Sequence, residues 1–199
     1  MKRITVGILG FGSVGTGVVK LLRQNHDQLL KRSGVDLCIG AIAVRDKKKS
    51  RSIKIPTSLL TDDPFDVVND PRIDVIVEVM GGVQPAKQLV EAALRQKKYV
   101  VTANKELIAK HGYALFALAK KNGVDLYYEA SVAGGIPIIR TLKVGFAPNK
   151  ITEIAGIING TTNFILSEMD QKGRAYADVL RDAQDAGYAE ANPKADVQG

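Results

Sequence analysis

The sequence predicts an α/β fold in which a doubly wound parallel sheet is followed by a smaller, incomplete unit. Two observations predict it: short apolar runs alternate with helical patterns, and a glycine-rich turn joins the first apolar run to the first helix. The composition is that of a globular protein, since 45% of the 199 residues are hydrophobic and 25% are charged. A chain of this length can bury the core of one domain and part of a second.

The alternation of strands and helices begins at the amino terminus. Residues 3–9 form an apolar run, and residues 13–31 carry apolar side chains at roughly helical spacing. Further strands are expected over 36–44 and 74–79. The elements that follow are a helix over 85–96, a strand over 99–102, a helix over 104–121 with Asn104 near its cap, and a strand over 124–128. Such alternation predicts a parallel sheet with helices on both faces.

The pattern changes after about Glu129. Residues 130–137 are small and rich in glycine, as in a hinge or a site loop. The elements expected beyond them are a helical stretch to about Val144, a strand over 151–158, and helices over 161–172 and 175–186. One strand and a few helices make a poor independent core, so we expect an incomplete α+β unit, or one that pairs with another copy. The unpaired edge of such a sheet predicts a homodimer.

The formal net charge is +7, and part of the basic charge is clustered. One short stretch holds Arg45, Lys47, Lys48, Lys49, Arg51 and Lys54. This stretch is either a solvated loop or a site for phosphate groups. The sequence has neither zinc-finger spacing nor an aromatic RNA-binding signature, so nucleic acid is not an expected partner.

The single cysteine, Cys38, excludes a disulfide within the chain and fits a reducing compartment. We expect it to be a buried, inert thiol within a strand. His26 and His111 lack metal-ligand spacing and are expected on solvated helix faces. No apolar run is long enough to cross a bilayer, and glycines interrupt the first one, so we expect no membrane partner, no signal peptide and a cytoplasmic protein.

The turn after the first strand has the spacing G-x-G-x-x-G. Its residues are Gly10, Phe11, Gly12, Ser13, Val14 and Gly15. The spacing alone is weakly specific, but here it follows a predicted strand and opens a predicted helix, as dinucleotide binding requires. Gly10 permits a tight turn, Gly12 lets the backbone approach a pyrophosphate, and Gly15 lets the helix pack on the strand. Residues 1–130 are therefore expected to form a Rossmann-type, NAD(P)-binding domain with these six residues in its cofactor site.

The end of the second strand indicates which dinucleotide binds. Arg45 stands where an acidic residue usually holds the ribose hydroxyls of NAD, and three lysines follow it. A guanidinium group binds phosphate as a planar fork, so the sequence favours NADP over NAD. The alternative is Asp46, which a shift of one residue would make the ribose ligand of NAD.

Four further segments, taken with the glycine turn, resemble homoserine dehydrogenases over the whole chain. They are 102–105 (TANK), 129–137 (EASVAGGIP), 159–166 (NGTTNFIL) and 187–193 (GYAEANP) with Asp196. The resemblance implies interconversion of L-aspartate 4-semialdehyde and L-homoserine with NAD(P)H, a step of threonine and methionine biosynthesis. It also implies that residues 131–199 are the amino-terminal part of a substrate-binding and dimerisation domain.

The resemblance also assigns roles to single residues. Lys105 matches the family's catalytic lysine near the nicotinamide, and Glu190 matches the glutamate that binds the substrate's amino group. Thr161, Tyr188 and Asp196 match other substrate-pocket positions, and Gly187 matches a position close to the cofactor. Spacing alone would make Lys105 a surface lysine and Glu190 one acid in a polar loop, so these roles depend on the resemblance.

A cation site is implied in the same way. Glu129, Val132, Gly134 and Ile136 match the family's site for a monovalent cation, generally sodium, in which most ligands are backbone carbonyls. Oxygen ligands suit a hard cation. A hinge that needs small residues would have the same composition, and the two interpretations are compatible.

The sequence departs from the family pattern at its end. In the family the last motif continues into a helix with a substrate-positioning aspartate and a second lysine, the usual proposed proton donor. The sequence stops before both, at Gly199, and has Gln198 where an acid is more usual, so we expect a truncated homoserine dehydrogenase. Two alternatives stay open: an NADP-binding fragment without catalysis, and another Rossmann amino-acid dehydrogenase.

Overall fold

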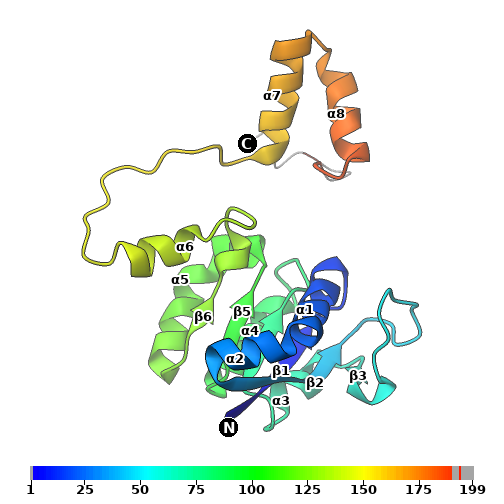
Figure 1. Cartoon of the computed structure of the whole chain (residues 1–199), viewed down its shortest axis with the longest axis vertical. Helices are drawn as coiled ribbons and strands as arrows, with labels where there is room; N and C mark the ends of the chain where they lie inside the picture. The colour runs from blue at the N-terminus through cyan, green and yellow to red at the C-terminus, as the bar shows by residue number, and fades with distance from the viewer. Residues whose placement is uncertain (1, 190–192, 194–199) are drawn as a thin grey trace. The chain divides into compact units, whose positions relative to one another are not determined.

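The computed structural model describes residues 2–189 and residue 193. The chain separates into two compact units, residues 1–147 and residues 148–199. The first unit contains the sheet and most of the helices, and the second contains an extended segment and a helix pair (Figure 1). Each unit is described by itself below.

The first unit is built on a six-stranded, wholly parallel sheet with the order β3-β2-β1-β4-β5-β6. The strands are β1 Lys2–Leu9, β2 Val35–Ala43, β3 Leu60–Thr61, β4 Val75–Glu78, β5 Tyr99–Thr102 and β6 Leu126–Tyr127. The direction of winding reverses between β1 and β4, which leaves a crevice at their carboxyl ends. This arrangement confirms the predicted Rossmann-type, doubly wound α/β fold.

Two apolar cores lie on the two faces of the sheet. The helices of the first unit are α1 Ser13–Gln24, α2 His26–Ser33, α3 Pro64–Asn69, α4 Ala86–Arg95 and α5 Lys105–Asn122. Side chains of α3, α4 and α5 share one core with Leu9 and Ile76. Val19 of α1 shares the other with Val6 and Ile8. Adjacent residues of β1 therefore enter opposite cores, as a strand buried on both faces requires.

Local signals set both ends of α5, and the sequence predicted the one at its start. The side chain of Asn104 accepts a hydrogen bond from the backbone N–H of Leu107, at 3.0 Å, and caps the first turn. Gly123 ends the helix in the left-handed conformation, with φ of 70°. The start of α5 is thereby fixed at the carboxyl end of β5, where ligands bind in such sheets.

Two parts of the first unit differ from the sequence-based expectation. The helix expected over 13–31 is divided at Asn25 into α1 and α2. The short elements η1 Thr57–Leu59, β3 and α3 were not predicted. The start of α3 did carry a signal, because Asp63 caps it through the N–H of Phe65 at 2.8 Å and Pro64 is its first residue.

The segment after β6 contains short helical turns. They are η2 Glu129–Ser131, α6 Ile138–Arg140 and the π-helical turn η3 Thr141–Gly145. The second unit contains α7 Gly160–Lys172 and α8 Tyr176–Asp185, close to the two predicted helices. Ile165, Val179 and Ala183 form its small core.

The strand expected over 151–158 was a wrong prediction. This segment is extended but belongs to no sheet, and all eight of its residues are exposed. Ile154, Ile157 and Ile158 are 68%, 77% and 98% exposed. An apolar run becomes a strand only by pairing with a hydrogen-bonding neighbour, and among the described residues this segment pairs with no strand.

No helix within the described residues has the length and apolar character that a bilayer span demands.

Candidate functional site

The turn between β1 and α1 is shaped by glycines that perform different tasks. Gly10 has φ of 102°, and a β-carbon there would lie 2.8 Å from the carbonyl oxygen of Val79. A β-carbon at Gly15 would lie 2.2 Å from the carbonyl oxygen of Gly10. Gly12 differs, because a β-carbon there would meet nothing within 4 Å. Gly10 and Gly15 allow the turn to close, and Gly12 leaves open space at the first residues of α1.

This open space fits a pyrophosphate group. Gly12 is the N-cap of α1, and no side chain caps that helix. The first amides of α1 are therefore available to an anion, and the helix dipole favours one there. Ser13 and Val14 are the first two residues of α1, and both side chains are exposed.

An open cavity of about 320 Å³ adjoins the turn. The residues that line it come from the glycine turn (Gly10, Phe11, Gly12), from the segment after β2 (Ala43, Val44, Arg45, Asp46, Lys49, Arg51), from the β3–α3 connection (Asp62, Pro64) and from the chain after β4 (Val79, Met80). The structure thus brings Arg45 to the same cavity as the glycine turn, as the sequence predicted. Three basic side chains and two acidic ones surround this end of the crevice.

Arg51 belongs to the basic stretch noted in the sequence, and the structure places it in the lining of this cavity. Its Nη2 donates to the carbonyl oxygen of Asp46 at 2.6 Å, and its Nη1 donates to that of Lys49 at 2.8 Å. Its Cζ lies 5.3 Å from the centre of the Phe11 ring. Its Nε is buried and has no hydrogen-bond partner among the described residues. A buried donor without a partner is rare, so this Nε–H is available to an acceptor that the described part of the chain does not supply.

Asp46, the alternative ribose ligand, also lines the cavity. Its Oδ1 accepts a hydrogen bond from the backbone N–H of Lys48 at 2.7 Å, which orders the turn after β2. Asp62, on the opposite side, pairs with Lys47 at 2.7 Å. The hydrogen bond from Lys47 lowers the pKa of Asp62. One of the three lysines after Arg45 is thereby engaged by an acid, whereas Lys49 lines the cavity.

Lys105 lies at the carboxyl end of β5 as the first residue of α5, and its side chain is exposed. Among the residues that the structure describes, no hydrogen bond or ion pair takes up its ammonium group. The segment before it is buried, since Thr102 and Asn104 are 1% and 5% exposed. The ammonium group of Lys105 therefore extends from a buried segment at the ligand-binding edge of the sheet, without a partner among the described residues.

The four residues predicted to hold a cation lie in one loop. Glu129 begins η2, Val132 follows its last residue, and Gly134 has φ of 58°. Ile136 is 64% exposed. Both carboxyl oxygens of Glu129 accept backbone N–H groups at 2.8 Å, from Ile139 and from Arg140. The carboxyl group therefore also holds α6 against the loop.

In the second unit the structure brings two of the predicted substrate residues together. The hydroxyl of Thr161 donates to the carbonyl oxygen of Tyr188 at 2.6 Å. Thr161 is 7% exposed, whereas Tyr188 is 60% exposed and its ring packs on Phe164 with 5.2 Å between centroids. Gly187 precedes Tyr188 in the left-handed conformation, with φ of 76°. Glu190 and Asp196 lie outside the described residues.

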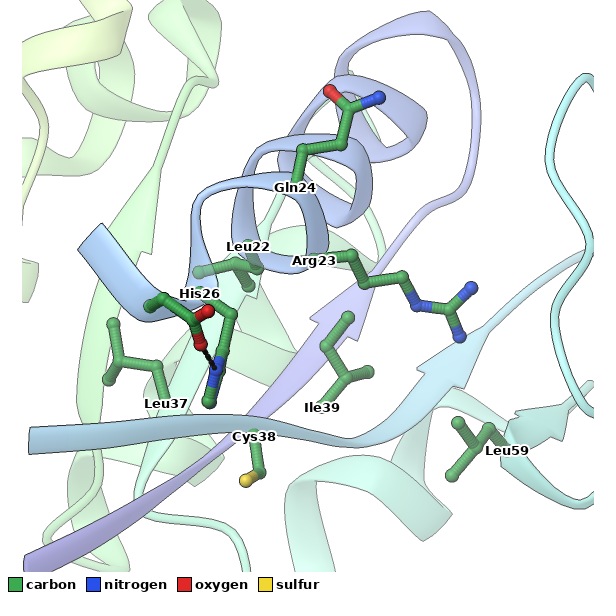
Figure 2. Close-up of a pocket in the computed structure, with 9 residues that line it drawn as sticks. Leu22, Arg23, Gln24, His26, Leu37, Cys38, Ile39 and Leu59 are labelled. Carbon is green, nitrogen blue, oxygen red and sulfur yellow. Dashed lines mark hydrogen bonds and ion pairs between the residues drawn. The ribbon is translucent and has the colours of Figure 1, made fainter. Parts of the chain in front are cut away.

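A second open cavity, of about 500 Å³, lies between β2 and the helices α1 and α2 (Figure 2). Leu37 and Ile39 point into it from β2, and Cys38 points to the opposite side of the strand (Figure 2). None of the residues that the sequence assigned to a site lines this cavity. Burial, followed by the hydrogen bond to Asp36, raises the pKa of the Cys38 thiol, which fits an inert cysteine.

His26 has partners that the sequence did not indicate. Its Nε2 lies 3.0 Å from Oδ1 of Asp36 and its Nδ1 lies 3.2 Å from Oδ1 of Asp27. The hydrogen bond to Asp36, and then that to Asp27, raises the pKa of His26. The hydrogen bonds from His26 and from Arg3 lower the pKa of Asp36 to about 2. His26 is 41% exposed in its side chain, but it ties the start of α2 to β2.

The sequence matches two families along its length. Residues 10–129 match the family described as "Homoserine dehydrogenase, NAD binding domain", and residues 137–199 match "Homoserine dehydrogenase". The chain is 51% identical to homoserine dehydrogenase of Bacillus subtilis and 48% identical to that of Neisseria gonorrhoeae. Each alignment covers 100% of this chain and 46% of the relative. The chain thus spans about half the length of the curated relatives it matches.

Solved structures agree with the sequence comparison. A homoserine dehydrogenase from Thiobacillus denitrificans superimposes with a TM-score of 0.92 and 50% identity, covering 99% of this chain and 46% of the other. A hyperthermophilic archaeal homoserine dehydrogenase in complex with NADPH gives a TM-score of 0.82 and 25% identity over 99% of this chain and 65% of the other. The glycine turn, the parallel sheet and both matched families lead to one conclusion: the chain belongs to the homoserine dehydrogenase family.

Proposed function

We propose that the protein acts in the NAD(P)-dependent interconversion of L-aspartate 4-semialdehyde and L-homoserine. Residues 1–130 would bind the dinucleotide, and residues 131–199 would form the first part of the substrate-binding domain. The observation that carries the proposal is the open space at Gly12, which lies at the amino terminus of α1 and beside the cavity after β2. In Rossmann folds the pyrophosphate binds at this position, where the free N–H groups at the start of the first helix face it.

NADP is the proposed dinucleotide, with NAD the alternative. Arg45, Lys49 and Arg51 supply positive charge around one cavity, and the buried Nε–H of Arg51 has no partner among the residues that the structure describes. A 2′-phosphate would offer acceptor oxygens to these groups, whereas the ribose hydroxyl of NAD offers no negative charge. The archaeal relative in complex with NADPH supports this assignment.

The chemistry needs a hydride and a proton at the carbonyl group of the aldehyde. The bound nicotinamide cofactor supplies the hydride. The Nζ of Lys105 has no competing partner among the described residues and projects from the ligand-binding edge of the sheet. We assign to Lys105 a hydrogen bond to the substrate's carbonyl oxygen, which stabilises the negative charge that develops there, and the resemblance assigns the proton to the second lysine beyond Gly199.

The remaining roles follow the resemblance. Thr161 and Tyr188, which are hydrogen-bonded to each other, would line the substrate pocket with Glu190 and Asp196, and Gly187 would lie near the cofactor. The loop of Glu129, Val132, Gly134 and Ile136 would hold sodium. A homodimer and a cytoplasmic location complete the proposal: the exposed segment 151–158 has the apolar character of a strand that needs a neighbour, and the single cysteine fits a reducing compartment.

Two measurements test the proposal. Calorimetry of the 199-residue chain should show binding of NADPH, and weaker binding of NADH; no binding of either dinucleotide would overturn it. A chain of the relatives' full length should reduce NADP when L-homoserine is added, and Lys105→Ala should lower kcat by about a hundredfold or more, as loss of a donor to the developing oxyanion does. Cofactor binding without turnover in the full-length chain would leave a binding protein and reject the dehydrogenase.

A further inference from the structure

The carboxyl group of Glu78 is completely buried at the carboxyl end of β4, in the middle of the sheet. Three donors converge on it. The backbone N–H of Met80 donates to Oε1 at 2.9 Å, and the hydroxyl of Thr102 donates to Oε2 at 2.6 Å. The amide nitrogen of Asn104 lies 3.5 Å from Oε1. Burying a carboxyl group costs more free energy than burying an apolar side chain of similar size, so we expect its hydrogen bonds to give Glu78 a specific role.

Asn104 connects this acid to the two segments that border the nicotinamide end of the crevice. Its Nδ2 donates to the carbonyl oxygen of Gly82 at 2.6 Å, and its Oδ1 caps α5 through the N–H of Leu107. Its own N–H donates to the hydroxyl of Thr102 at 3.0 Å. The chain after β4 and the first turn of α5 are therefore joined through the side chain of Asn104, while Glu78 accepts hydrogen bonds from Met80 and Thr102 beside it.

The turn after β4 has little side-chain packing of its own, whereas α5 is also held by Leu107 and Leu115 in the core. Gly81 and Gly82 both have left-handed backbones, with φ of 76° and 71°, and a β-carbon at either would meet nothing within 4 Å. Lys105 projects from the first residue of α5, and its own side chain has no partner in the described chain. The hydrogen bonds that Glu78 accepts and those of Asn104 thus help to set the path of the glycine turn and the place from which Lys105 extends.

We propose that Glu78 is a positioning residue: it holds the 80–82 turn and the base of Lys105 in the geometry that receives the nicotinamide half of the dinucleotide. The inference rests on the proposed function. It predicts a selective effect on the nicotinamide half. Within the described chain, no hydrogen bond joins the carboxyl group of Glu78 to the glycine turn after β1 or to the basic segment after β2, which would bind the other half of the cofactor, and Met80 alone among the lining residues of the cavity there donates to it.

Glu78→Gln tests this selectivity. One carboxyl oxygen becomes an amide nitrogen, which cannot accept the hydroxyl proton of Thr102, while the size of the side chain is unchanged. Calorimetry of the 199-residue chain would compare two ligands, NADPH and adenosine 2′,5′-bisphosphate, which lacks the nicotinamide. We expect Glu78→Gln to weaken NADPH binding by about tenfold, the effect of roughly one hydrogen bond, and to change binding of the bisphosphate by less than about twofold.

A pair of variants at Thr102 supplies the matched control. Thr102→Ser keeps the hydroxyl that donates to Glu78 and should retain NADPH affinity, whereas Thr102→Val keeps the shape without the hydroxyl and should reproduce the loss. The fluorescence of bound NADPH should change in Thr102→Val and Glu78→Gln and not in Thr102→Ser, because it reports the surroundings of the reduced nicotinamide. This readout remains available if one of the variants folds poorly.

The outcomes are distinct. Equal weakening of both ligands would make Glu78 a support of the whole domain and would overturn the positioning role. Unchanged binding of NADPH in both Glu78→Gln and Thr102→Val would also overturn it. If the unaltered chain bound neither ligand, the proposed function itself would fail, and this inference with it.

Discussion

The carbonyl oxygen of Gly10 occupies the place of the side chain that Gly15 lacks, since a β-carbon at Gly15 would lie 2.2 Å from it. Backbone cannot move aside as a flexible side chain can, so Gly15→Ala should force β1 and α1 apart. We expect a loss of about 2 kcal/mol or more in the free energy of unfolding, as in other overpacked sites. Thermal unfolding followed by circular dichroism measures this loss.

Gly12→Ala is the matched comparison for that variant. A methyl group at residue 12 meets no atom within 4 Å and changes stability by about 1 kcal/mol at most, the usual range for an N-cap exchange. It does enter the space proposed for the pyrophosphate, so NADPH affinity should fall at least about tenfold, a change of roughly 1.4 kcal/mol. A Gly12→Ala chain that binds NADPH normally would contradict the placement of the pyrophosphate.

Arg51 should contribute to the choice between NADPH and NADH. Its guanidinium donates to two backbone carbonyls, and its buried Nε–H finds no acceptor in the described part of the chain. Arg51→Ala should weaken NADPH binding by about ten- to hundredfold, the range for a hydrogen bond to a charged group, and should weaken NADH binding much less. Lys54→Ala, in the same basic stretch but outside the cavity lining, is the control. Equal effects of Arg51→Ala on both dinucleotides would exclude a role in recognising the 2′-phosphate.

Local chemistry explains which parts of the fold were predictable. The G-x-G-x-x-G turn, the cap at Asn104 and the alternation of apolar runs act within a few residues, and the structure has each where the sequence placed it. The two-residue strand β3 depends on pairing with β2, where Ile42 and Ala43 lie opposite Leu60 and Thr61. A strand so short has no periodic signal of its own.

The same reasoning explains what was missed in the site. The acceptor group of Glu78 meets donors from residues up to 26 positions away, and the guanidinium of Arg51 is directed by the carbonyl of a residue five positions before it. Neither arrangement follows from spacing. For segment 151–158 the error is the reverse: the sequence predicted an element that the structure lacks. Its apolar pattern predicted a strand, but a strand also needs a hydrogen-bonding neighbour.

The pair of His26 and Asp36 should make stability depend on pH. The pKa of His26 is raised by its hydrogen bonds to Asp36 and Asp27, so its contribution is complete below the unfolded value of about 6.5 and is lost as pH rises through the folded value. The pKa of Asp36 is lowered to about 2, so its contribution is present above its unfolded value and is lost as pH falls toward 2. The pair therefore stabilises most between about pH 4 and pH 6.5.

His26→Gln tests this dependence. Melting temperatures of the original chain should decrease from pH 6 to pH 8 by more than those of His26→Gln, because the variant has no imidazolium to deprotonate. His111→Gln, at the other histidine of the chain, should leave the difference unchanged. Parallel curves for the original chain and His26→Gln would show that the pair does not contribute to stability.

The carboxyl group of Glu129 joins the proposed cation loop to α6. Its two oxygens accept the N–H groups of Ile139 and Arg140, each at 2.8 Å. Glu129→Ala removes both acceptors, and Glu129→Gln retains one. Hydrogen exchange at these two amides should accelerate by about tenfold or more in Glu129→Ala, the size expected for losing a hydrogen bond to a charged group, and less in Glu129→Gln.

Sodium should also change exchange at these amides in the original chain, relative to choline at equal ionic strength, because a bound cation would share the same carboxyl oxygens. Identical exchange in sodium and choline would remove the support for a cation at Glu129, whereas unchanged exchange in Glu129→Ala would show that α6 is held by other contacts.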